Sequence, residues 1–155
     1  MNDTPLFRRA LPQEAAVLTH IALTAKQSWG YPAEWMAEWR PDLTIAPGYI
    51  AGSPVWVAEA EGAVVGFLGL VRADSQWHLE HLWVRPEFQG RGLGRALFGE
   101  AVRQARALGA TELRIKSDPN AEPFYLKMGA VRTGLDVYDL LGKIRREVPQ
   151  LSYRL

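Results

Sequence analysis

The sequence predicts an α/β protein in which a mixed β-sheet is flanked by helices. Strand-like runs follow one another through the middle of the chain, and the apolar period changes to that of a helix at Gly92. A clean strand–helix–strand repeat, typical of a purely parallel sheet, is absent. The length of 155 residues suits one domain, which we place at 1–155.

The first part of the chain is expected to form a strand and two helices. Leu6–Leu11 reads as a short strand, and Pro12 begins a helix to about Gln27, because Pro suits a first turn and apolar residues recur at helical spacing. Ala33–Arg40 is predicted as a second, short helix that Pro41 stops. The segment Leu43–Ser53 is rich in Pro and Gly and is predicted to be a loop.

Strands dominate the middle of the chain. Val55–Ala60 and Ala63–Arg72 flank Glu61-Gly62, a hairpin turn signal, and Gln76–Val84 is a third strand. A helix with one apolar face follows at Gly92–Leu108. The remaining elements are a strand, a helix and two strands, at Glu112–Lys116, Asn120–Met128, Val131–Leu140 and Val148–Leu155.

Composition excludes several classes of function. The net charge of +1, from 18 basic and 17 acidic residues, argues against a dedicated nucleic-acid binder. The chain has no cysteine, which rules out disulfides, a cysteine nucleophile and thiolate metal sites. His78 and His81 are expected on opposite faces of a strand, so no metal site is predicted. No apolar run suits a membrane span and no signal-peptide core is visible, so we expect a cytoplasmic protein.

A glycine-rich turn joins the third strand of the middle region to the strong helix. Backbone N–H groups converge in such a turn, and the helix N-terminus adds partial positive charge, so the turn predicts a phosphate cradle. Arg91 could add a formal charge. The turn is not a Walker loop, because no Gly-Lys-Ser/Thr follows. Gly90, Gly92 and Gly94 are also spaced by twos, unlike the dinucleotide pattern.

Two motifs in this region resemble those of the GNAT superfamily of N-acetyltransferases. Gln89-Gly90-Arg91-Gly92-Leu93-Gly94 resembles the family signature Gln/Arg-x-x-Gly-x-Gly/Ala, and the strand exit before it, Leu82 to Pro86, is similar too. Asn120 with Tyr125-Leu126-Lys127-Met128-Gly129-Ala130 resembles the second motif, an Asn followed by a Tyr-x-x-x-Gly-Phe/Ala turn. The resemblance covers roughly Val55 to Leu140, and the residues before it match in layout only.

The resemblance implies a GNAT-like fold with a mostly antiparallel, twisted sheet that splays at a site for acetyl-CoA. Acetyl-CoA would act as co-substrate, without a metal. The loop backbone would hold the pyrophosphate, the pantetheine arm would pair with the splayed strand and contact Asn120, and Tyr125 would lie by the sulfur. The residues so assigned to acetyl-CoA are Leu82, Trp83, Val84, Gln89, Gly90, Arg91, Gly92, Leu93, Gly94, Asn120 and Tyr125.

Transfer from a thioester to an amine sets the catalytic roles. The amine must lose a proton, since amines near the lysine value of ~10 are charged at neutral pH. The Val84 N–H could stabilise the oxyanion, and Tyr125 is our choice for the acid at the leaving thiolate. Without a cysteine or a Gly-x-Ser-x-Gly elbow, direct attack by the amine is the simplest mechanism.

The resemblance implies a base on the strand before the loop, because family members that use a side-chain base often carry it there. His78, Glu80 and Leu82 fall on one face by a period of two, and His81 points the other way. Glu80 is nearer the thioester by sequence, whereas His78 has the better natural pKa. A water relay without a single base is a further alternative, and a bulge in the strand would alter this assignment.

The family resemblance places the acceptor near the first two helices and their connection. Trp29 and Tyr31 lie in that connection and are candidate substrate residues. Glu34 or Glu38 could attract a cationic amine beside an aromatic wall. The second helix also carries two tryptophans four residues apart, Trp35 and Trp39. We expect both in the buried apolar stripe of that helix.

The leading hypothesis is therefore an N-acetyltransferase that acts on a primary amine of an unidentified small molecule or peptide. One alternative is a module of the same fold that binds acyl-CoA without catalysis, as a sensor or subunit. A plain nucleotide-binding domain is a weaker third option. The segment Leu151–Leu155 could be an edge strand that pairs in a homodimer.

Overall fold

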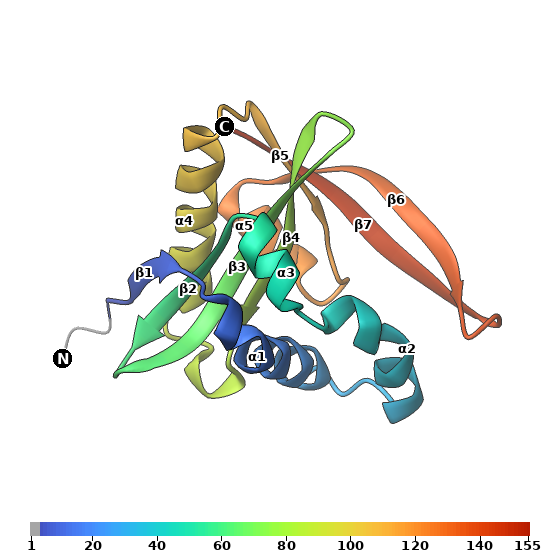
Figure 1. Ribbon diagram of the computed structural model, residues 1–155. Coiled ribbons are helices and arrows are strands. Elements are labelled where there is room, and N and C mark those ends of the chain that lie inside the picture. The colour runs from blue at the N-terminus through green and yellow to red at the C-terminus, as the bar shows by residue number, and fades with distance from the viewer. Residues whose placement is uncertain (1–3) are drawn as a thin grey trace.

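The computed structural model describes residues 4–155, and Met1–Asp3 of the expected domain lie outside the described residues. A seven-stranded sheet in the order β1-β2-β3-β4-β5-β7-β6 lies between two helical layers (Figure 1). The strands are β1 (Leu6–Arg9), β2 (Val55–Ala60), β3 (Ala63–Ala73), β4 (Gln76–Val84), β5 (Glu112–Lys116), β6 (Val131–Leu140) and β7 (Ile144–Arg154). The helices are α1 (Ala15–Gln27), α2 (Ala33–Leu43), α3 (Pro47–Gly52), α4 (Leu93–Ala107) and α5 (Glu122–Met128).

Each face of the sheet carries its own apolar core. The buried stripe of α4 packs on one face, where Leu97, Ala101 and Ala105 are fully buried in one cluster with strand residues such as Leu68 and Leu113. Helices α1, α2 and α3 cover the other face (Figure 1). The amphipathic pattern of α4 therefore specifies its position, since a single apolar stripe must be buried against the sheet.

The sheet opens in the middle, at β4. All neighbouring strands are antiparallel except β4 and β5, which run parallel and pair only at Trp77, His78 and Leu79. Beyond Leu79, β4 stays paired with β3 up to Val84, but no strand in residues 4–155 pairs with its other side. The mixed sheet, its flanking helices and the expected splay are thus confirmed.

Two expectations for the helical segments were wrong. The predicted loop Leu43–Ser53 contains α3, in which Pro47 begins the helix and Ile50 is buried. Pro41 does not stop α2, which continues to Leu43. Burial of Leu43 favours the extra turn, and the Thr44 hydroxyl donates to the Arg40 carbonyl at 2.7 Å.

The C-terminal strand also differs from expectation. β7 begins at Ile144 rather than Val148, because the charged run before Val148 pairs with β6 in a long hairpin. β7 lies between β5 and β6, so Leu151–Leu155 is not a sheet edge, and the edges are β1 and β6. Within residues 4–155, no helix is both long enough and apolar enough to cross a membrane.

Candidate active site

The loop before α4 presents a run of free backbone donors. Gly90 and Gly92 both have φ of 79°, a left-handed conformation that favours glycine. Across residues 4–155, no acceptor receives the backbone N–H groups of residues 90–95. These donors lie at the N-terminus of a 15-residue helix, so helix dipole and open N–H groups together favour an anion there.

Arg91 and the glycines contribute differently to this cradle. The Arg91 guanidinium lies over the Phe88 ring at 4.8 Å, which keeps its charge beside the loop. The positive φ alone favours glycine at Gly90 and Gly92, because a Cβ at either position would meet no atom of residues 4–155 within 4 Å. The same open space lets a ligand approach the loop backbone. At Gly94 a Cβ would lie 3.4 Å from the Phe124 ring, an ordinary van der Waals contact between α4 and α5.

The free edge of β4 leads into the cradle. Leu82, Trp83 and Val84 pair with β3 on one side and face the opening between β4 and β5 on the other. An extended ligand could add to this edge as a strand does, with its anionic end at the loop. The predicted cofactor residues of β4 and of the loop therefore form one continuous surface.

Tyr125 of α5 is buried in the apolar core shared with α4. Its ring contacts those of Phe98 and Phe124, with centroids 6.0 and 5.2 Å away. Burial raises the pKa of the Tyr125 hydroxyl well above its ordinary value. The group is therefore a phenol at neutral pH, able to donate a hydrogen bond but weaker as an acid than an exposed tyrosine.

A bulge in β4 changes the expected side-chain directions. Gly69 of β3 pairs with His81 and Leu70 pairs with Leu79, so Glu80 is an extra, unpaired residue. Leu82 consequently packs in the α4 core, and the prediction that it shares a face with Glu80 was wrong. His81 was expected to point away but instead contacts the Tyr49 ring, on the α3 side.

Glu80 and Tyr49 meet over this bulge. The Tyr49 hydroxyl donates to Glu80 Oε2 at 3.3 Å. A Cβ at Gly69 would lie 2.5 Å from the same hydroxyl, so the glycine provides the space through which Tyr49 reaches Glu80. Burial, followed by the Glu80 charge, raises the pKa of the Tyr49 hydroxyl, which keeps it a donor.

The two histidines of β4 occupy different environments. His81 is buried, and its Nδ1 accepts a hydrogen bond from Trp83 Nε1 at 3.0 Å. Burial lowers the pKa of His81 to about 4, so the imidazole is neutral. His78 pairs with Arg114 where β4 and β5 are still joined, whereas Glu80 lies where they separate.

The candidate acceptor residues lie on the α1–α2 side of the opening. Trp29 is partly exposed, and its ring lies 6.1 Å from that of Trp83 on β4. The Tyr31 hydroxyl accepts a hydrogen bond from Asn120 Nδ2 at 2.9 Å. A residue predicted for the acceptor and one predicted for the pantetheine arm are thus in direct contact. Trp39 is buried as expected and donates to the Tyr138 hydroxyl of β6 at 2.9 Å.

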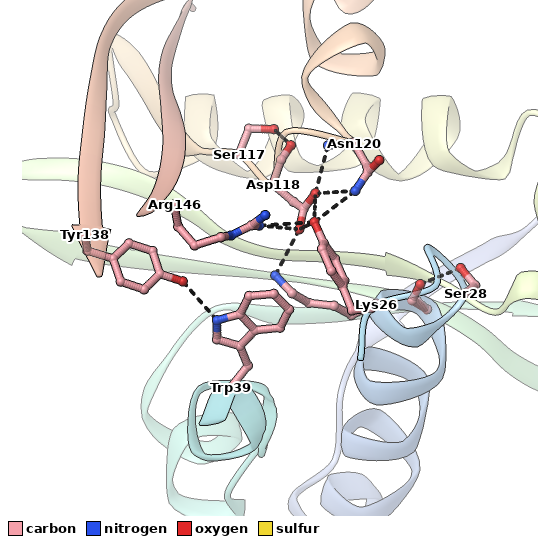
Figure 2. A network of polar contacts seen from close by, with 10 residues as sticks. Lys26, Ser28, Trp39, Ser117, Asp118, Asn120, Tyr138 and Arg146 are labelled. Carbon is pink, nitrogen blue, oxygen red and sulfur yellow. Dashed lines mark hydrogen bonds and ion pairs between the residues drawn. The ribbon is translucent and has the colours of Figure 1, made fainter. Parts of the chain in front are cut away.

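A buried charge cluster lies beside this contact and was not anticipated. Figure 2 shows Lys26, Arg146 and Asn120 converging on Asp118. Lys26 Nζ lies 3.1 Å from the Asp118 carboxylate, and the Tyr31 hydroxyl donates to it at 2.8 Å. The position of Asp118 directly after a buried strand was a sequence signal for a functional residue. No such signal marked Lys26 or Arg146, because each stands in a polar stretch typical of a solvated surface.

The aromatic rings on the acceptor side, those of Tyr31, Trp35 and Trp39, already contact cations of the protein itself. Lys26 Nζ lies 4.3 Å from the Trp39 ring centre, and the Arg146 guanidinium lies 5.1 to 5.5 Å from the rings of Tyr31, Trp35 and Trp39. Glu34 and Glu38 are exposed on α2. Because Lys26 and Arg146 already occupy these rings, the expectation that the rings bind a cationic amine was wrong.

No cluster in residues 4–155 brings three His, Asp or Glu side chains close enough to hold a metal ion. A cavity at the other end of β4, beside the end of α4, contains none of the predicted site residues.

Comparison with known proteins shows the family to which this fold and these motifs correspond. A model described as the acetyltransferase (GNAT) family matches residues 18–130. The chain is 34% identical over 109 residues to peptidyl-lysine N-acetyltransferase YjaB of Escherichia coli, covering 69% of this chain and 70% of that protein. It is 30% identical over 127 residues to human N-acetyltransferase 8, covering 67% of this chain and only 56% of that relative.

Solved structures agree over the whole chain. A GCN5-related N-acetyltransferase structure from Rhodopseudomonas palustris has a TM-score of 0.83 at 26% identity, covering 100% of this chain and 98% of the other. The PaiA N-acetyltransferase of Thermoplasma acidophilum, solved with coenzyme A, has a TM-score of 0.76 at 18% identity, covering 100% of both chains, and supports the fold alone.

Proposed function

The chain belongs to the acetyltransferase (GNAT) family, and on that premise we propose that it transfers acetyl from acetyl-CoA directly to a primary amine. We treat residues 1–155 as one domain that performs this reaction. The observation that supports the proposal most is the run of free N–H donors at residues 90–95, continuous with the unpaired edge of β4. A pyrophosphate joined to an extended arm fits that surface.

Acetyl-CoA supplies the activated carbonyl carbon. In the proposed reaction the neutral amine attacks that carbon, a C–N bond forms and the C–S bond breaks. One proton leaves the amine nitrogen, and the departing thiolate ends as the CoA thiol. The Val84 N–H, at the end of β4, is our candidate donor to the carbonyl oxygen as negative charge develops on it.

Glu80 is our proposed base, acting directly or through one water. It is exposed at the point where β4 and β5 separate, and Tyr49 holds one of its oxygens. His78 lies deeper in the paired part of the strand and is therefore the weaker candidate. A water relay remains the competing arrangement, and a Glu80→Gln variant with an unchanged rate would favour it.

Tyr125 is our proposed partner of the leaving sulfur. Its raised pKa makes complete proton transfer to a thiolate unfavourable on its own, because thiols are stronger acids, with a reference pKa of ~8.5 for cysteine. The expected contribution is a hydrogen bond that stabilises the developing negative charge, with the proton balance completed through solvent. This role needs only the hydroxyl and not the aromatic ring.

Calorimetric titration with acetyl-CoA, ATP and NAD tests the binding half of the proposal. We expect saturable binding of acetyl-CoA alone, and its loss in Gly92→Glu, which places a carboxylate in the anion cradle. Gly109→Glu is the matched control, because Gly109 also has a positive φ (82°) and open space, at the far end of α4. Equal binding by both variants would contradict the cradle.

Release of CoA separates an enzyme from a sensor of the same fold. An acetyltransferase releases CoA with at least one amine of a panel, whereas an acyl-CoA sensor binds tightly and releases none. One relative is named for peptidyl-lysine, so lysine peptides belong in the panel beside small amines. Binding without turnover across that panel would favour the sensor.

A further inference from the structure

The charge cluster beside the acceptor side has an excess of positive charge. Lys26 and Arg146 supply two cations to the single carboxylate of Asp118, and the side chains are 15%, 14% and 5% exposed respectively. Asp42 also acts on Lys26, but it is exposed on α2, where water screens its charge. A buried excess charge is costly, so it favours an anionic partner.

Arg146 keeps one unpaired donor within residues 4–155, although it contacts Tyr31, Asp118 and Tyr138. Its Nη2 donates to the Tyr31 hydroxyl at 3.1 Å and lies 3.9 Å from Asp118, a much looser ion pair than the 3.1 Å contact of Lys26. Its Nε is buried and has no hydrogen-bond partner among the described residues. The Nε and Nη2 edge of a guanidinium is the geometry that receives a carboxylate through two parallel bonds.

The cluster is also in the right place for an acceptor. Asn120, our proposed contact for the pantetheine arm, donates to Tyr31 and to Asp118. The cluster thus contacts the side chain, Asn120, that is proposed to contact the ligand next to the thioester. A group held by Arg146 would belong to the molecule whose amine faces that thioester.

We propose that the acceptor carries a carboxylate near its primary amine, as an amino acid does, and that Arg146 with Lys26 binds this carboxylate. Arg146 is then a specificity-determining residue and not a catalytic one. The inference rests on the proposed acetyl transfer for its setting. It disfavours acceptors with additional positive charge, such as polyamines and lysine-rich peptides, because the cluster already holds two cations.

Matched amines that differ only in a carboxylate provide the test. L-phenylalanine is compared with phenethylamine, and L-lysine with cadaverine, by CoA release in the presence of acetyl-CoA. For the wild type we expect kcat/KM to favour the amino acid by about tenfold or more, the size that one charge-assisted hydrogen bond supplies. Arg146→Gln should bring the ratio close to one.

Arg145→Gln is the matched control, since Arg145 is the neighbour on β7 with a side chain 68% exposed, and it should keep the wild-type preference. Equal rates for both members of each pair, or faster reaction of cadaverine or a lysine peptide, would overturn the inference and leave acetyl transfer standing. If Arg146→Gln does not fold, the wild-type ratio decides alone.

A failure of the proposed function gives a different pattern. If acetyl-CoA binds but no amine is acetylated, the wild type with CoA is titrated with N-acetyl-L-phenylalanine and with N-acetylphenethylamine. Saturable binding of the acid alone supports the carboxylate site even without turnover. Binding of neither compound, or of both equally, overturns it.

Discussion

At the scale of single residues, Tyr125 offers the sharpest test of chemistry. We expect Tyr125→Phe to lower kcat by about 100-fold, in the range of acid–base and hydrogen-bonding contributions, with little change in the KM for acetyl-CoA. The ring contacts with Phe98 and Phe124 remain, so the melting temperature should hold. Stopped assays of CoA release and thermal denaturation measure the two quantities. An unchanged kcat would remove Tyr125 from the leaving-group role.

His81 predicts how stability depends on pH. Its folded pKa of about 4 lies below the unfolded value of 6.5, so the unfolded chain binds the extra proton between those values. The contribution is therefore fully present above pH 6.5 and is lost as pH falls towards 4, by about 3 kcal/mol at most. Denaturant unfolding of the wild type at several pH values should show this loss.

His81→Gln is the comparison that isolates this effect, because it keeps an acceptor for Trp83 Nε1 and removes the titrating group. The difference in unfolding free energy between the two proteins should vary with pH only across that window. A constant difference between pH 4 and 7 would mean that His81 is not the responsible group.

Residue types could be predicted from the sequence more readily than residue directions. The glycines of the loop, Asn120 and Tyr125 belong to local motifs, and their backbone positions followed from them. The directions of Leu82 and His81 depended on the bulge at Glu80, which is created by pairing with β3 and leaves no mark within β4 itself. In the sequence Arg146 stands in a charged run, and only the packing of β6 and α2 around it makes it a buried residue.

At the scale of elements, Tyr49 of α3 reaches Glu80 of β4 across β3, where Gly69 has no side chain in the way. Gly69→Ala would place a methyl group 2.5 Å from the Tyr49 hydroxyl and displace it from Glu80. We expect kcat to fall by about tenfold, because a misplaced catalytic group loses its productive geometry. The KM for acetyl-CoA should change little, since the proposed cradle consists of backbone donors of residues 90–95, and neither Gly69 nor Tyr49 belongs to it.

A double-mutant cycle distinguishes displacement from general damage. In a Tyr49→Phe background the hydroxyl is gone, and the nearest ring carbon lies 3.4 Å from the added methyl, which is tolerable. Gly69→Ala should therefore cost little further activity in that background, and the two changes should not add. Fully additive losses would show that Tyr49 and Gly69 act independently.

Element boundaries could be predicted where periodicity is strong and the neighbours are local. The stripe of α4 and the hairpin at Glu61-Gly62 are examples, and both are present. The short helix α3 and the last turn of α2 form because Ile50 and Leu43 are buried against the sheet, and Pro and Gly masked them in the sequence. The early start of β7 depends on β6 pairing with a charged segment.

At the scale of the whole molecule, the sheet consists of two parts that are joined by a short stretch of strand pairing. In the part of the chain that the structure describes, strands β1 to β4 pair continuously, whereas β5, β7 and β6 join them by strand pairing only where three residues of β4 pair with β5 (Figure 1). Tyr138 of the β6–β7 hairpin accepts a hydrogen bond from Trp39 of α2, beside the residues proposed for the acceptor. The two parts therefore meet at the surface proposed for the pantetheine arm.

This arrangement predicts where a bound ligand stabilises the protein. Acetyl-CoA at 100 times its Kd should raise the free energy of unfolding by about 2.7 kcal/mol, because it binds the folded state alone. Amide hydrogen exchange should slow beyond that global effect at residues 80–84 and 90–95, which have a free edge and open donors without ligand. The outer edge of β6 lies two strands from the opening and should gain no local protection. Uniform protection throughout the chain would mean that the ligand does not bridge the two parts.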